Sequence, residues 1–305
     1  MKTILITGCA GFIGSSFLKN IINKNYNIVG IDDLSAGSIK RLPKNKKFRF
    51  IKGDCSNPKI LNKIKGKIDV IMHLAGQSSG EKSFYDPVND MKRNLFSTIV
   101  LLDFYLKKKS KQFIYASSMS VYGDKRKKVK ETDSCKPISF YGLTKLSSEK
   151  FISMFSNKKI NYTILRLFNV YGEGQSLDNL KQGMIRIYLT QIFKNKNLIV
   201  KGSLKRFRDF IHINDVNKIL QKVIGNKNCI NKIFNVGFGK KYLVKDVVNL
   251  IRKKSRKKFK VFVKTNTPFD QYGIYSSSDK LFKAIKYRPK TSLSEGLDKF
   301  LLSIK

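Results

Sequence analysis

The sequence predicts an α/β protein with a doubly wound parallel sheet and a smaller, discontinuous C-terminal domain. Runs rich in β-branched residues alternate with stretches whose apolar residues recur at helical spacing, which is typical of parallel sheets with helical crossovers. A glycine-rich turn follows the first of these runs directly. With 305 residues, of which 41% are hydrophobic, the chain is also large enough to bury a sizeable core.

Six runs in the first part of the chain are the expected strands. They span residues 2–7, 27–33, 48–54, 69–76, 112–118 and 162–170. After the first run, apolar residues recur at helical spacing from Ile13 to Ile22, which predicts the first helix. Parallel sheets bind ligands at the carboxyl ends of their strands, so the residues that follow each run are candidate site residues.

The pattern becomes irregular after about Asn169, and this change predicts the domain organisation. We expect residues 1–168 to form the sheet domain, with elements near 208–240 returning to it, and 169–305 to form mainly a second domain. From about Phe259 onward, we expect a small appendage that closes over the site.

Charge and composition indicate whether nucleic acids, membranes or metal ions are expected partners of the chain. The formal net charge is +41, mostly from lysines spread along the whole chain without interleaved aromatic residues. We attribute it to a compositional bias and expect no nucleic-acid partner, although such a field attracts anionic substrates. No apolar stretch is long enough to cross a bilayer, so we expect no membrane partner and a cytoplasmic location. Four cysteines without CxxC spacing and two histidines argue against a metal site.

The glycine-rich turn is a candidate dinucleotide site. Gly8 permits a tight turn, Gly11 lets the backbone approach a pyrophosphate, and Gly14 allows close helix packing. Asp32 lies 18 residues after Gly14, at the end of the next predicted strand, where it can bond both ribose hydroxyls and thereby favours NAD.

Two further acids in this region have open roles. Asp33 is either a second cofactor contact or a capping or loop acid. Asp54, after the third predicted strand, either accepts a hydrogen bond from the adenine amino group or is a plain turn aspartate.

Tyr141, Lys145 and Ser118 form the candidate catalytic set. Tyr141 and Lys145 lie one helical turn apart in the segment SFYGLTK, and Ser118 ends an earlier predicted strand. A tyrosine with its ordinary pKa of about 10 is a useful base near neutral pH only if that pKa is lowered. We expect the lysine charge to lower it and the serine hydroxyl to share the proton. Behind a dinucleotide turn, this set predicts oxidation of a hydroxyl group.

The motifs TGCAGFIGS, GIDDLSAGS, HLAGQ, ASSMSVYGD, YGLTK, RLFNVYG and RDFIHINDV occur here in the order found in extended short-chain dehydrogenases/reductases. Over nearly its whole length the chain resembles nucleotide-sugar epimerases of the UDP-glucose 4-epimerase type. The resemblance implies a Rossmann domain that binds NAD, with Tyr141 as catalytic base and Lys145 on the nicotinamide ribose. It also implies that Ser118 hydrogen-bonds the 4-oxygen of the sugar.

The resemblance implies further site residues. The additional expected cofactor contacts are Phe12, Ile13, Asp33, Ser35, Asp54, Cys55, Leu74, Ala75, Gly76, Gln77, Asn94 and Phe168. The expected substrate contacts are Ser118, Asn169, Val200, Arg208, Asp270 and Gln271. Within that set, Asn169 and Arg208 match family residues that bind the substrate diphosphate, for which an arginine fork is well suited.

Oxidation at C4 of the sugar can lead to epimerisation, dehydration or decarboxylation, and the residues after Ser118 distinguish these three reactions. Family dehydratases have an Asp–Glu pair there, and decarboxylases usually have a glutamate; this chain has Met119 and Ser120, which cannot exchange a proton as a carboxylate does. We therefore predict an NAD-dependent nucleotide-sugar 4-epimerase, with a UDP-hexose as the expected substrate. The alternatives are a reductase of 4-keto nucleotide sugars or a dehydratase, and, outside enzymes, an NAD-binding or basic RNA-associated protein.

The chain departs from the family in the segment NTPFDQYGIYSSSD and at Ser78, where galactose-type epimerases often have a lysine. A second phosphate-binding arginine is missing from the segment NTPFDQYGIYSSSD, and Lys201 or Arg206 is the expected substitute. The segment DNLKQGM resembles enzymes of surface-polysaccharide biosynthesis.

Family members usually form homodimers through two helices, and this chain has apolar residues that could form such an interface. An ordinary core-facing role is the equal alternative for these residues. They are Phe96, Val100, Leu101, Phe104, Leu143, Leu146 and Met154.

Overall fold

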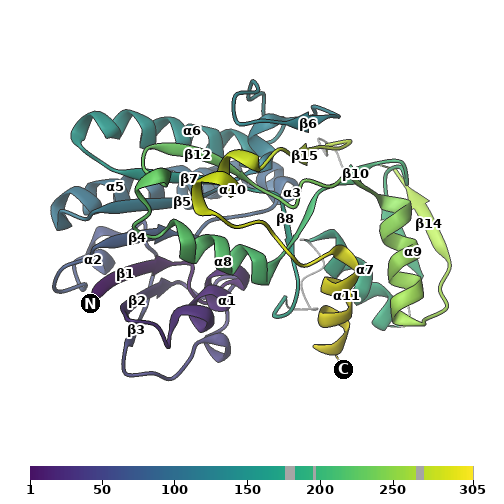
Figure 1. The fold of residues 1–305 in the computed structure, drawn as a ribbon, viewed down its shortest axis with the longest axis horizontal. Helices are drawn as coiled ribbons and strands as arrows, with labels where there is room; N and C mark the ends of the chain where they lie inside the picture. Colours follow the sequence, from purple (N-terminus) through teal and green to yellow (C-terminus); the bar gives the residue numbers. More distant parts are fainter. Residues whose placement is uncertain (176–182, 195–196, 266–270, 305) are drawn as a thin grey trace.

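The computed structural model describes residues 1–175, 183–194, 197–265 and 271–304. Its centre is a parallel sheet of seven strands in the order β12-β7-β5-β4-β1-β2-β3 (Figure 1). The strands are β1 (Lys2–Thr7), β2 (Tyr26–Asp32), β3 (Phe48–Lys52), β4 (Val70–His73), β5 (Gln112–Ser118), β7 (Tyr162–Leu167) and β12 (Lys232–Val236). The predicted α/β class and parallel sheet are confirmed. Strand order reverses between β1 and β4, and such a switch point opens a crevice at the carboxyl ends.

Helices cover both faces of the sheet because its central strands are apolar on both sides. In β1, Ile4 and Ile6 pack into one core cluster and Leu5 into the other. The first cluster includes residues of α1 (Phe12–Ile21), α8 (Ile213–Val223) and α10 (Asp279–Ile285). The second includes residues of α2 (Pro58–Leu61), α5 (Ser97–Lys108) and α6 (Phe140–Phe155). Short segments α3 (Gly80–Tyr85), α4 (Pro87–Met91) and η2 (Lys92–Phe96) lead into α5.

The sixth predicted strand is wrong in its extent. Residues 162–170 do not form one strand, because the chain leaves the main sheet at Phe168. The Phe168 amide still donates to Val236 O (3.0 Å), whereas the Asn169 amide donates to Asp209 O (3.2 Å). The following residues form β8 (Asn169–Tyr171), which pairs with β11 (Phe210–His212).

A smaller lobe lies beside the carboxyl ends of the strands, on the right in Figure 1. It has its own apolar core, to which α7 (Met184–Phe193), α9 (Val244–Ser255), α11 (Leu293–Leu302), β9 (Leu198–Lys201) and β14 (Val261–Lys264) contribute. The remaining elements are η1 (Ile39–Arg41), η3 (Met119–Tyr122), β6 (Lys128–Val129), η4 (Ser156–Lys158), β10 (Phe207–Arg208), η5 (Lys227–Cys229), β13 (Tyr242–Leu243) and β15 (Tyr275–Ser276).

The end of the chain is not the single appendage expected from Phe259 onward. The segment β14 pairs with β9 in the smaller lobe, and β15 then pairs with β6 beside the main sheet. Helix α10 packs against β12 and α8, and α11 returns to α9. The apolar residues of this tail, such as Leu281 and Leu297, belong to two different cores, so the tail ties the lobes together.

Part of the expected dimer surface lies in the interior instead. Leu101 and Phe104 are 0% and 5% exposed and belong to the core between α5 and the sheet, because they lie on the inner face of α5. Phe96, Leu143 and Met154 are 48%, 50% and 70% exposed. Val100 and Leu146 are half-buried.

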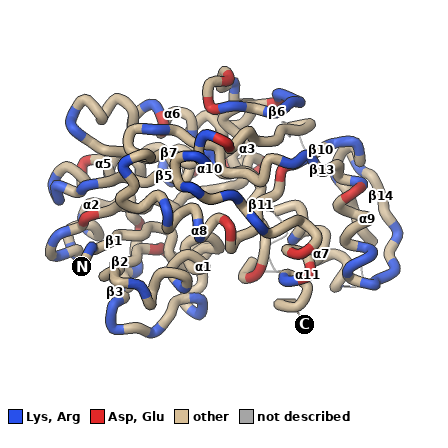
Figure 2. The backbone as a smooth tube through the Cα atoms, in the orientation of Figure 1, with Lys and Arg blue, Asp and Glu red and all other residues tan. Residues whose placement is uncertain are grey.

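Two surface properties bear on possible partners. Lys and Arg recur along nearly every part of the tube in Figure 2 rather than in one stripe, the distribution that a general compositional excess produces. Within the described ranges, no helix is both long and apolar enough to span a bilayer.

Candidate active site

A cavity of about 700 Å³ lies at the carboxyl ends of the sheet strands, and both lobes contribute to its wall. Most of the predicted site residues line it together, although they are far apart in sequence. Those residues are Gly8, Gly11, Phe12, Ile13, Gly14, Asp32, Asp33, Ser35, Asp54, Cys55, Leu74, Ala75, Gly76, Gln77, Ser118, Tyr141, Lys145, Phe168 and Asn169.

The glycine turn between β1 and α1 forms one wall. Gly8 has a φ of +70°, and a Cβ there would lie 2.7 Å from the Ala75 amide nitrogen, so only glycine fits. A Cβ on Gly14 would collide with the Gly8 carbonyl oxygen. At Gly11 a Cβ would meet only that same oxygen, at 3.3 Å, and would otherwise extend into open space.

The N-terminus of α1 is free to bind an anion. Its N-cap is Gly11, no side chain caps it, and its first turn contains no acidic residue. The amide groups and the helix dipole of this ten-residue helix therefore give the cavity a positive end. Together with the close approach at Gly8, this cradle fits the diphosphate of a dinucleotide.

Asp32 is at the end of β2, 8% exposed, and lines the cavity. Its carboxylate accepts hydrogen bonds from the Ala10 amide (2.9 Å) and the Leu34 amide (2.8 Å). These bonds fix the carboxylate beside the glycine turn, and each carboxylate oxygen retains capacity to accept another hydrogen bond. The position suits the predicted contact with ribose hydroxyls.

Asp33 is held by a cation that the sequence did not associate with it. Arg93 Nη1 lies 3.0 Å from its carboxylate, and the Ser35 hydroxyl donates to the carboxylate at 2.6 Å. Burial raises the pKa of Asp33, but the hydrogen bonds from Ser35 and the charge of Arg93 outweigh it, so the pKa lies below its ordinary value. Asp54 accepts from the Ser56 amide (2.8 Å) within its turn and also lines the cavity.

Ser118 and Tyr141 meet where β5 ends against the start of α6. Ser139 caps α6 by accepting from the Gly142 amide (3.1 Å). A Cβ on Gly142 would lie 2.6 Å from the Ser120 carbonyl oxygen, so this glycine lets the helix approach the end of β5 closely. The two site residues are 8% and 9% exposed.

The expected lowering of the Tyr141 pKa by Lys145 is absent from the structure. Burial raises the pKa of Tyr141 to about 12, although a hydrogen bond with Ser118 opposes the shift. The Lys145 ammonium instead donates to the Ala116 carbonyl oxygen (3.0 Å) and lies 4.8 Å from the ring centroid of Tyr115. Burial lowers the pKa of Lys145 to about 8, and the charges of Asp90 and Glu149 oppose that shift.

Asp90, which sequence reasoning did not single out, is not among the residues that line the cavity but contacts residues beside it. It is fully buried and accepts hydrogen bonds from Thr144 Oγ1 (2.6 Å), Gln77 Nε2 (2.8 Å) and Asn94 Nδ2 (3.1 Å). It therefore links the helix that carries Lys145 to the cofactor side of the cavity. Its spacing of four residues before Asn94 could have indicated the contact, but nothing in the sequence indicated that it is buried.

Asn94 lies behind the cavity wall rather than in it. Its Oδ1 is buried and has no hydrogen-bond partner among the described residues. A Cβ added to Gly76 would approach this oxygen closely and would lie 3.4 Å from Lys145 Nζ.

The substrate end of the cavity contains no carboxylate among its described residues. The acids that line the cavity are Asp32, Asp33 and Asp54, all on the cofactor side. Next to Ser118 the wall has Met119 and Ser120, and the Ser118 hydroxyl donates to Ser120 Oγ (3.1 Å).

Some predicted substrate residues do not line the cavity. Arg208 is 5% exposed and donates to the carbonyl oxygens of Phe207 (2.8 Å) and Tyr272 (3.1 Å). Val200 is fully buried in the core of the smaller lobe, and Gln271 donates to Gly123 O (2.7 Å). Asp270 and most of the segment DNLKQGM lie outside the described residues.

The expected substitutes for the missing arginine also have other contacts. Lys201 is paired with Glu81 at 3.2 Å, and Arg206 donates to the Lys201 carbonyl oxygen. Three arginines that sequence reasoning missed, Arg41, Arg93 and Arg186, do line the cavity. Arg186 lies among apolar residues at the start of α7, and no motif distinguishes it.

Comparisons with known proteins identify the family. A model of the NAD dependent epimerase/dehydratase family matches residues 4–237. A protein of Bacillus subtilis described as an uncharacterized UDP-glucose epimerase is 33% identical over 307 residues, which covers 96% of this chain and 95% of the relative.

Two solved structures are similar over almost the whole chain. The UDP-glucuronic acid 4-epimerase of Bacillus cereus, in complex with UDP-glucuronic acid and NAD, has a TM-score of 0.91 and 30% identity, covering 99% of this chain and 98% of that one. The UDP-glucose 4-epimerase of Thermotoga maritima, with UDP-glucose, has a TM-score of 0.93 and 28% identity with the same coverage. This chain therefore belongs to the NAD dependent epimerase/dehydratase family, and it is an enzyme with NAD as its cofactor.

Proposed function

We propose that the protein is a 4-epimerase of nucleotide sugars, with a UDP-hexose as its substrate. One observation carries the proposal: Ser118, Tyr141 and Lys145 meet in a cavity whose substrate end has no carboxylate among the described residues. Dehydration and decarboxylation after oxidation at C4 need a further acid or base at that end, whereas epimerisation does not. The similar proteins described as UDP-sugar epimerases support the same substrate class.

Residues of the cofactor side have the chemistry to hold NAD. The amide groups at Gly11 and the start of α1 would bind its diphosphate, and Asp32 its adenosine ribose. Bound NAD supplies an acceptor that takes a hydride from C4 of the sugar and returns it. We propose that residues 1–168, with the elements near 208–240, hold this cofactor and that 169–305 mainly bind the substrate.

Tyr141 is the proposed general base. Its phenol is buried beside Ser118, so a sugar hydroxyl in the cavity can pass its proton to Tyr141 while Ser118 holds the same oxygen. Burial raises the pKa of Tyr141 and the hydrogen bond with Ser118 opposes that shift, so Ser118 is the residue proposed to assist ionisation of Tyr141 when the site is filled. The same phenol returns the proton after the sugar has turned over in the site.

Product analysis tests the proposed reaction. The purified enzyme is incubated with UDP-glucose, UDP-N-acetylglucosamine and UDP-glucuronic acid, and the products are read by proton NMR. We expect the C4 epimer of at least one sugar to form without consumption of added NADH or NADPH. A stable 4-keto-6-deoxy product would indicate a dehydratase, and stoichiometric NAD(P)H consumption with a 4-keto sugar would indicate a reductase.

A tyrosine variant tests the assigned base. Tyr141→Phe should lower kcat by roughly 10²–10⁴-fold, because it removes the proton acceptor, while NAD stays bound. Tyr105→Phe is the matched control, since Tyr105 is also buried but lies on α5 against the Asn161 amide. Turnover of the Tyr141 variant close to that of the control would show that another group is the base.

We also propose that the enzyme is a homodimer that pairs through the exposed apolar side chains of η2 and α6. Phe96, Phe140, Leu143 and Met154 are 41–70% exposed, which is unusual for neighbouring apolar residues on a monomer. Sedimentation should give twice the monomer mass, and Leu143→Glu with Met154→Glu should give the monomer. An unchanged sedimentation coefficient in this double variant would place the interface elsewhere.

A further inference from the structure

Arg93 brings a positive charge to the cofactor side of the cavity, beside the acids at the end of β2. It belongs to η2, whereas Asp32 is the last residue of β2 and Asp33 follows it. All three residues line the cavity. Arg93 and Asp33 are 60 residues apart in the chain, so the contact between them depends on the fold.

Three hydrogen bonds fix the guanidinium group of Arg93. Nη1 donates to the Asp33 carboxylate (3.0 Å) and to the Ser35 hydroxyl (2.9 Å), and Nε donates to Asn89 Oδ1 (3.0 Å). Nη2 takes part in none of these three bonds, and the side chain is still 33% exposed. Arg93 therefore retains donors that a ligand in the cavity can use.

Asp33 offsets the charge of Arg93. Its carboxylate also accepts from the amide (2.9 Å) and the hydroxyl (2.6 Å) of Ser35, so the loop after β2 holds it against the arginine. Burial raises the pKa of Asp33, but the hydrogen bonds from Ser35 and the charge of Arg93 bring it below its ordinary value. The carboxylate is therefore ionised at neutral pH, and the pair carries no net charge.

The two nicotinamide cofactors differ at the 2′-oxygen of the adenosine ribose, which is a hydroxyl in NAD and part of a phosphate in NADP. A carboxylate such as Asp32 accepts hydrogen bonds from ribose hydroxyls, whereas a nearby arginine accommodates a 2′-phosphate. This cavity has both kinds of residue on its cofactor side. Selectivity therefore depends on whether the charge of Arg93 is available to a ligand.

We propose that the Asp33–Arg93 pair is a determinant of cofactor specificity. Asp33 neutralises Arg93 and adds a second negative charge beside Asp32, so the ribose site accepts the uncharged hydroxyl of NAD and rejects the phosphate of NADP. An arginine released from Asp33 presents a charged fork that suits this phosphate. This role rests on the proposed position of the adenosine ribose at Asp32, and it does not depend on the sugar or on the reaction.

Competition between the two cofactors tests this role. The purified protein is incubated with equal concentrations of NAD and NADP until the bound ratio is constant, and the nucleotides released on denaturation are quantified by mass spectrometry. The variants are Asp33→Asn, Arg93→Met and the two combined. Asp103→Asn is the control for net charge, because Asp103 pairs with Lys107 at the surface of α5. Circular dichroism checks that each variant is folded.

The wild type and Asp103→Asn should retain NAD almost exclusively. Asp33→Asn should raise the ratio of bound NADP to bound NAD about ten- to hundredfold, because it removes one repelling charge and releases Arg93 for the phosphate. This gain should shrink at high salt. The combined variant should lose most of the gain, since the arginine makes the attractive contact, and Arg93→Met alone should keep the preference for NAD.

Two results in folded variants would overturn the role of the pair. One is a ratio of bound NADP to NAD in Asp33→Asn equal to that in Asp103→Asn, which is the result expected if the pair only holds the loop after β2. The other is an equal gain in Asp33→Asn and in the combined variant, which would show that Arg93 takes no part.

Asp32→Asn separates failure of this role from failure of the proposed cofactor position. It should lower the amount of bound NAD, and an unchanged amount would refute the ribose position itself and the role of the pair with it. None of these measurements needs turnover. A protein that epimerises none of the tested sugars can therefore still confirm the role of Asp33 and Arg93, and an active epimerase can still refute it.

Discussion

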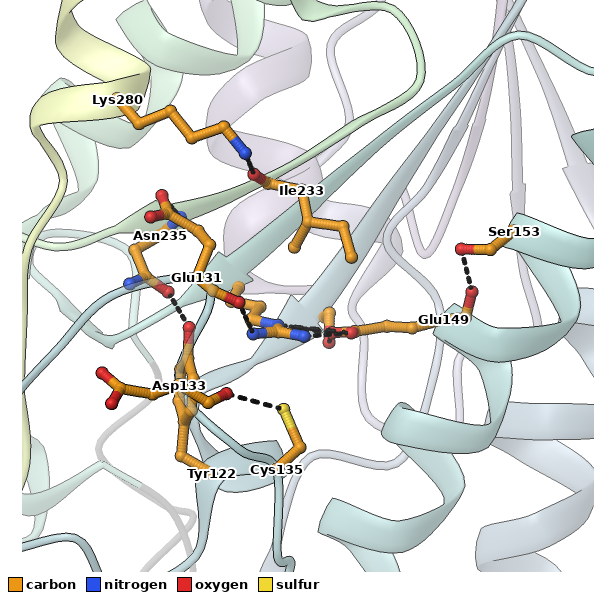
Figure 3. A network of polar contacts seen from close by, with 11 residues as sticks. Tyr122, Glu131, Asp133, Cys135, Glu149, Ser153, Ile233, Asn235 and Lys280 are labelled. Carbon is orange, nitrogen blue, oxygen red and sulfur yellow. Dashed lines mark hydrogen bonds and ion pairs between the residues drawn. The ribbon is translucent and has the colours of Figure 1, made fainter.

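A buried ion pair behind the active site gives the sharpest test of how this fold is held together. Glu149 of α6 and Arg166 of β7 are 3% and 4% exposed at their side chains, and Nη2 of the arginine lies 2.7 Å from the carboxylate. Arg166 Nε (3.0 Å) and the Ser117 hydroxyl (2.5 Å) also donate to Glu149 (Figure 3). Glu149 is one turn beyond Lys145, so the pair fixes the catalytic helix to the sheet.

Glu149→Gln should destabilise the protein strongly because it leaves the Arg166 charge buried without a counter-charge. Removing one partner of such a pair costs about 3–5 kcal/mol. An unfolding entropy of about 2.1 cal/mol/K per residue gives ~0.64 kcal/mol/K for 305 residues, so the expected fall in Tm is roughly 5–8 °C. Asp103→Asn is the matched control, because Asp103 pairs with Lys107 at the surface and such a pair contributes about 0.5 kcal/mol or less.

Thermal unfolding followed by circular dichroism measures these shifts. A second variant, Glu149→Leu with Arg166→Met, removes both charges and should recover much of the lost Tm, since a buried ion pair can be replaced by apolar residues at small cost. The reasoning fails if Glu149→Gln changes Tm no more than Asp103→Asn does. It also fails if the double variant is less stable than the single one, since the unpaired charge would then not be the cause.

Three further predictions follow from the site. Gly14→Ala should destabilise the protein and abolish NAD binding, because the added Cβ would collide with the backbone of the glycine turn. Gly80→Ala is the control: its added Cβ would lie 3.7 Å from the nearest neighbour, so Tm should change little. The affinity of the free enzyme for NAD should be constant below about pH 8 and fall above it. Burial lowers the Lys145 pKa to about 8, and only the protonated ammonium binds the ribose. An affinity that stays constant up to about pH 10 would contradict this. Asp90→Asn should move the midpoint of this fall in NAD affinity to lower pH, since the Asp90 charge raises the Lys145 pKa. Fluorescence titration with NAD measures the pH profiles of the wild type and the variant. A midpoint at higher pH in the variant would show that the Asp90 charge does not raise the Lys145 pKa.

The glycine turn shows why part of this site could be predicted from the sequence. Gly8, Gly11 and Gly14 stand between a predicted strand and a predicted helix, and Asp32 ends the next strand. These residues act through local geometry, because the turn, the helix N-terminus and the strand end lie within one βαβ unit. The same holds for Tyr141 and Lys145, whose spacing on one helix face follows from the helical repeat.

Contacts across the two lobes could not be predicted in this way. The family resemblance implied a diphosphate contact for Arg208, and Lys201 or Arg206 was the expected further cation. In the structure these three side chains contact carbonyl oxygens or Glu81, whereas Arg41, Arg93 and Arg186 line the cavity. The lowered Tyr141 pKa was also expected from spacing alone, whereas burial raises it. Burial is a property of the whole packing, so a short motif does not contain it.

The sequence by itself predicted the parallel sheet, the cofactor turn and the residues of the proposed catalytic set, because strand and helix periodicity and the residues of a single βαβ unit are local. Only the tertiary structure decided which charges surround that set. Asp90 on α4 and Glu149 on α6 come from different helices, and the charges of both oppose the loss of the Lys145 charge. Arg186 reaches the cavity from a lobe that begins more than a hundred residues after the cofactor turn. Electrostatic energy depends on distance and burial in space, and neither can be read from the order of residues along the chain.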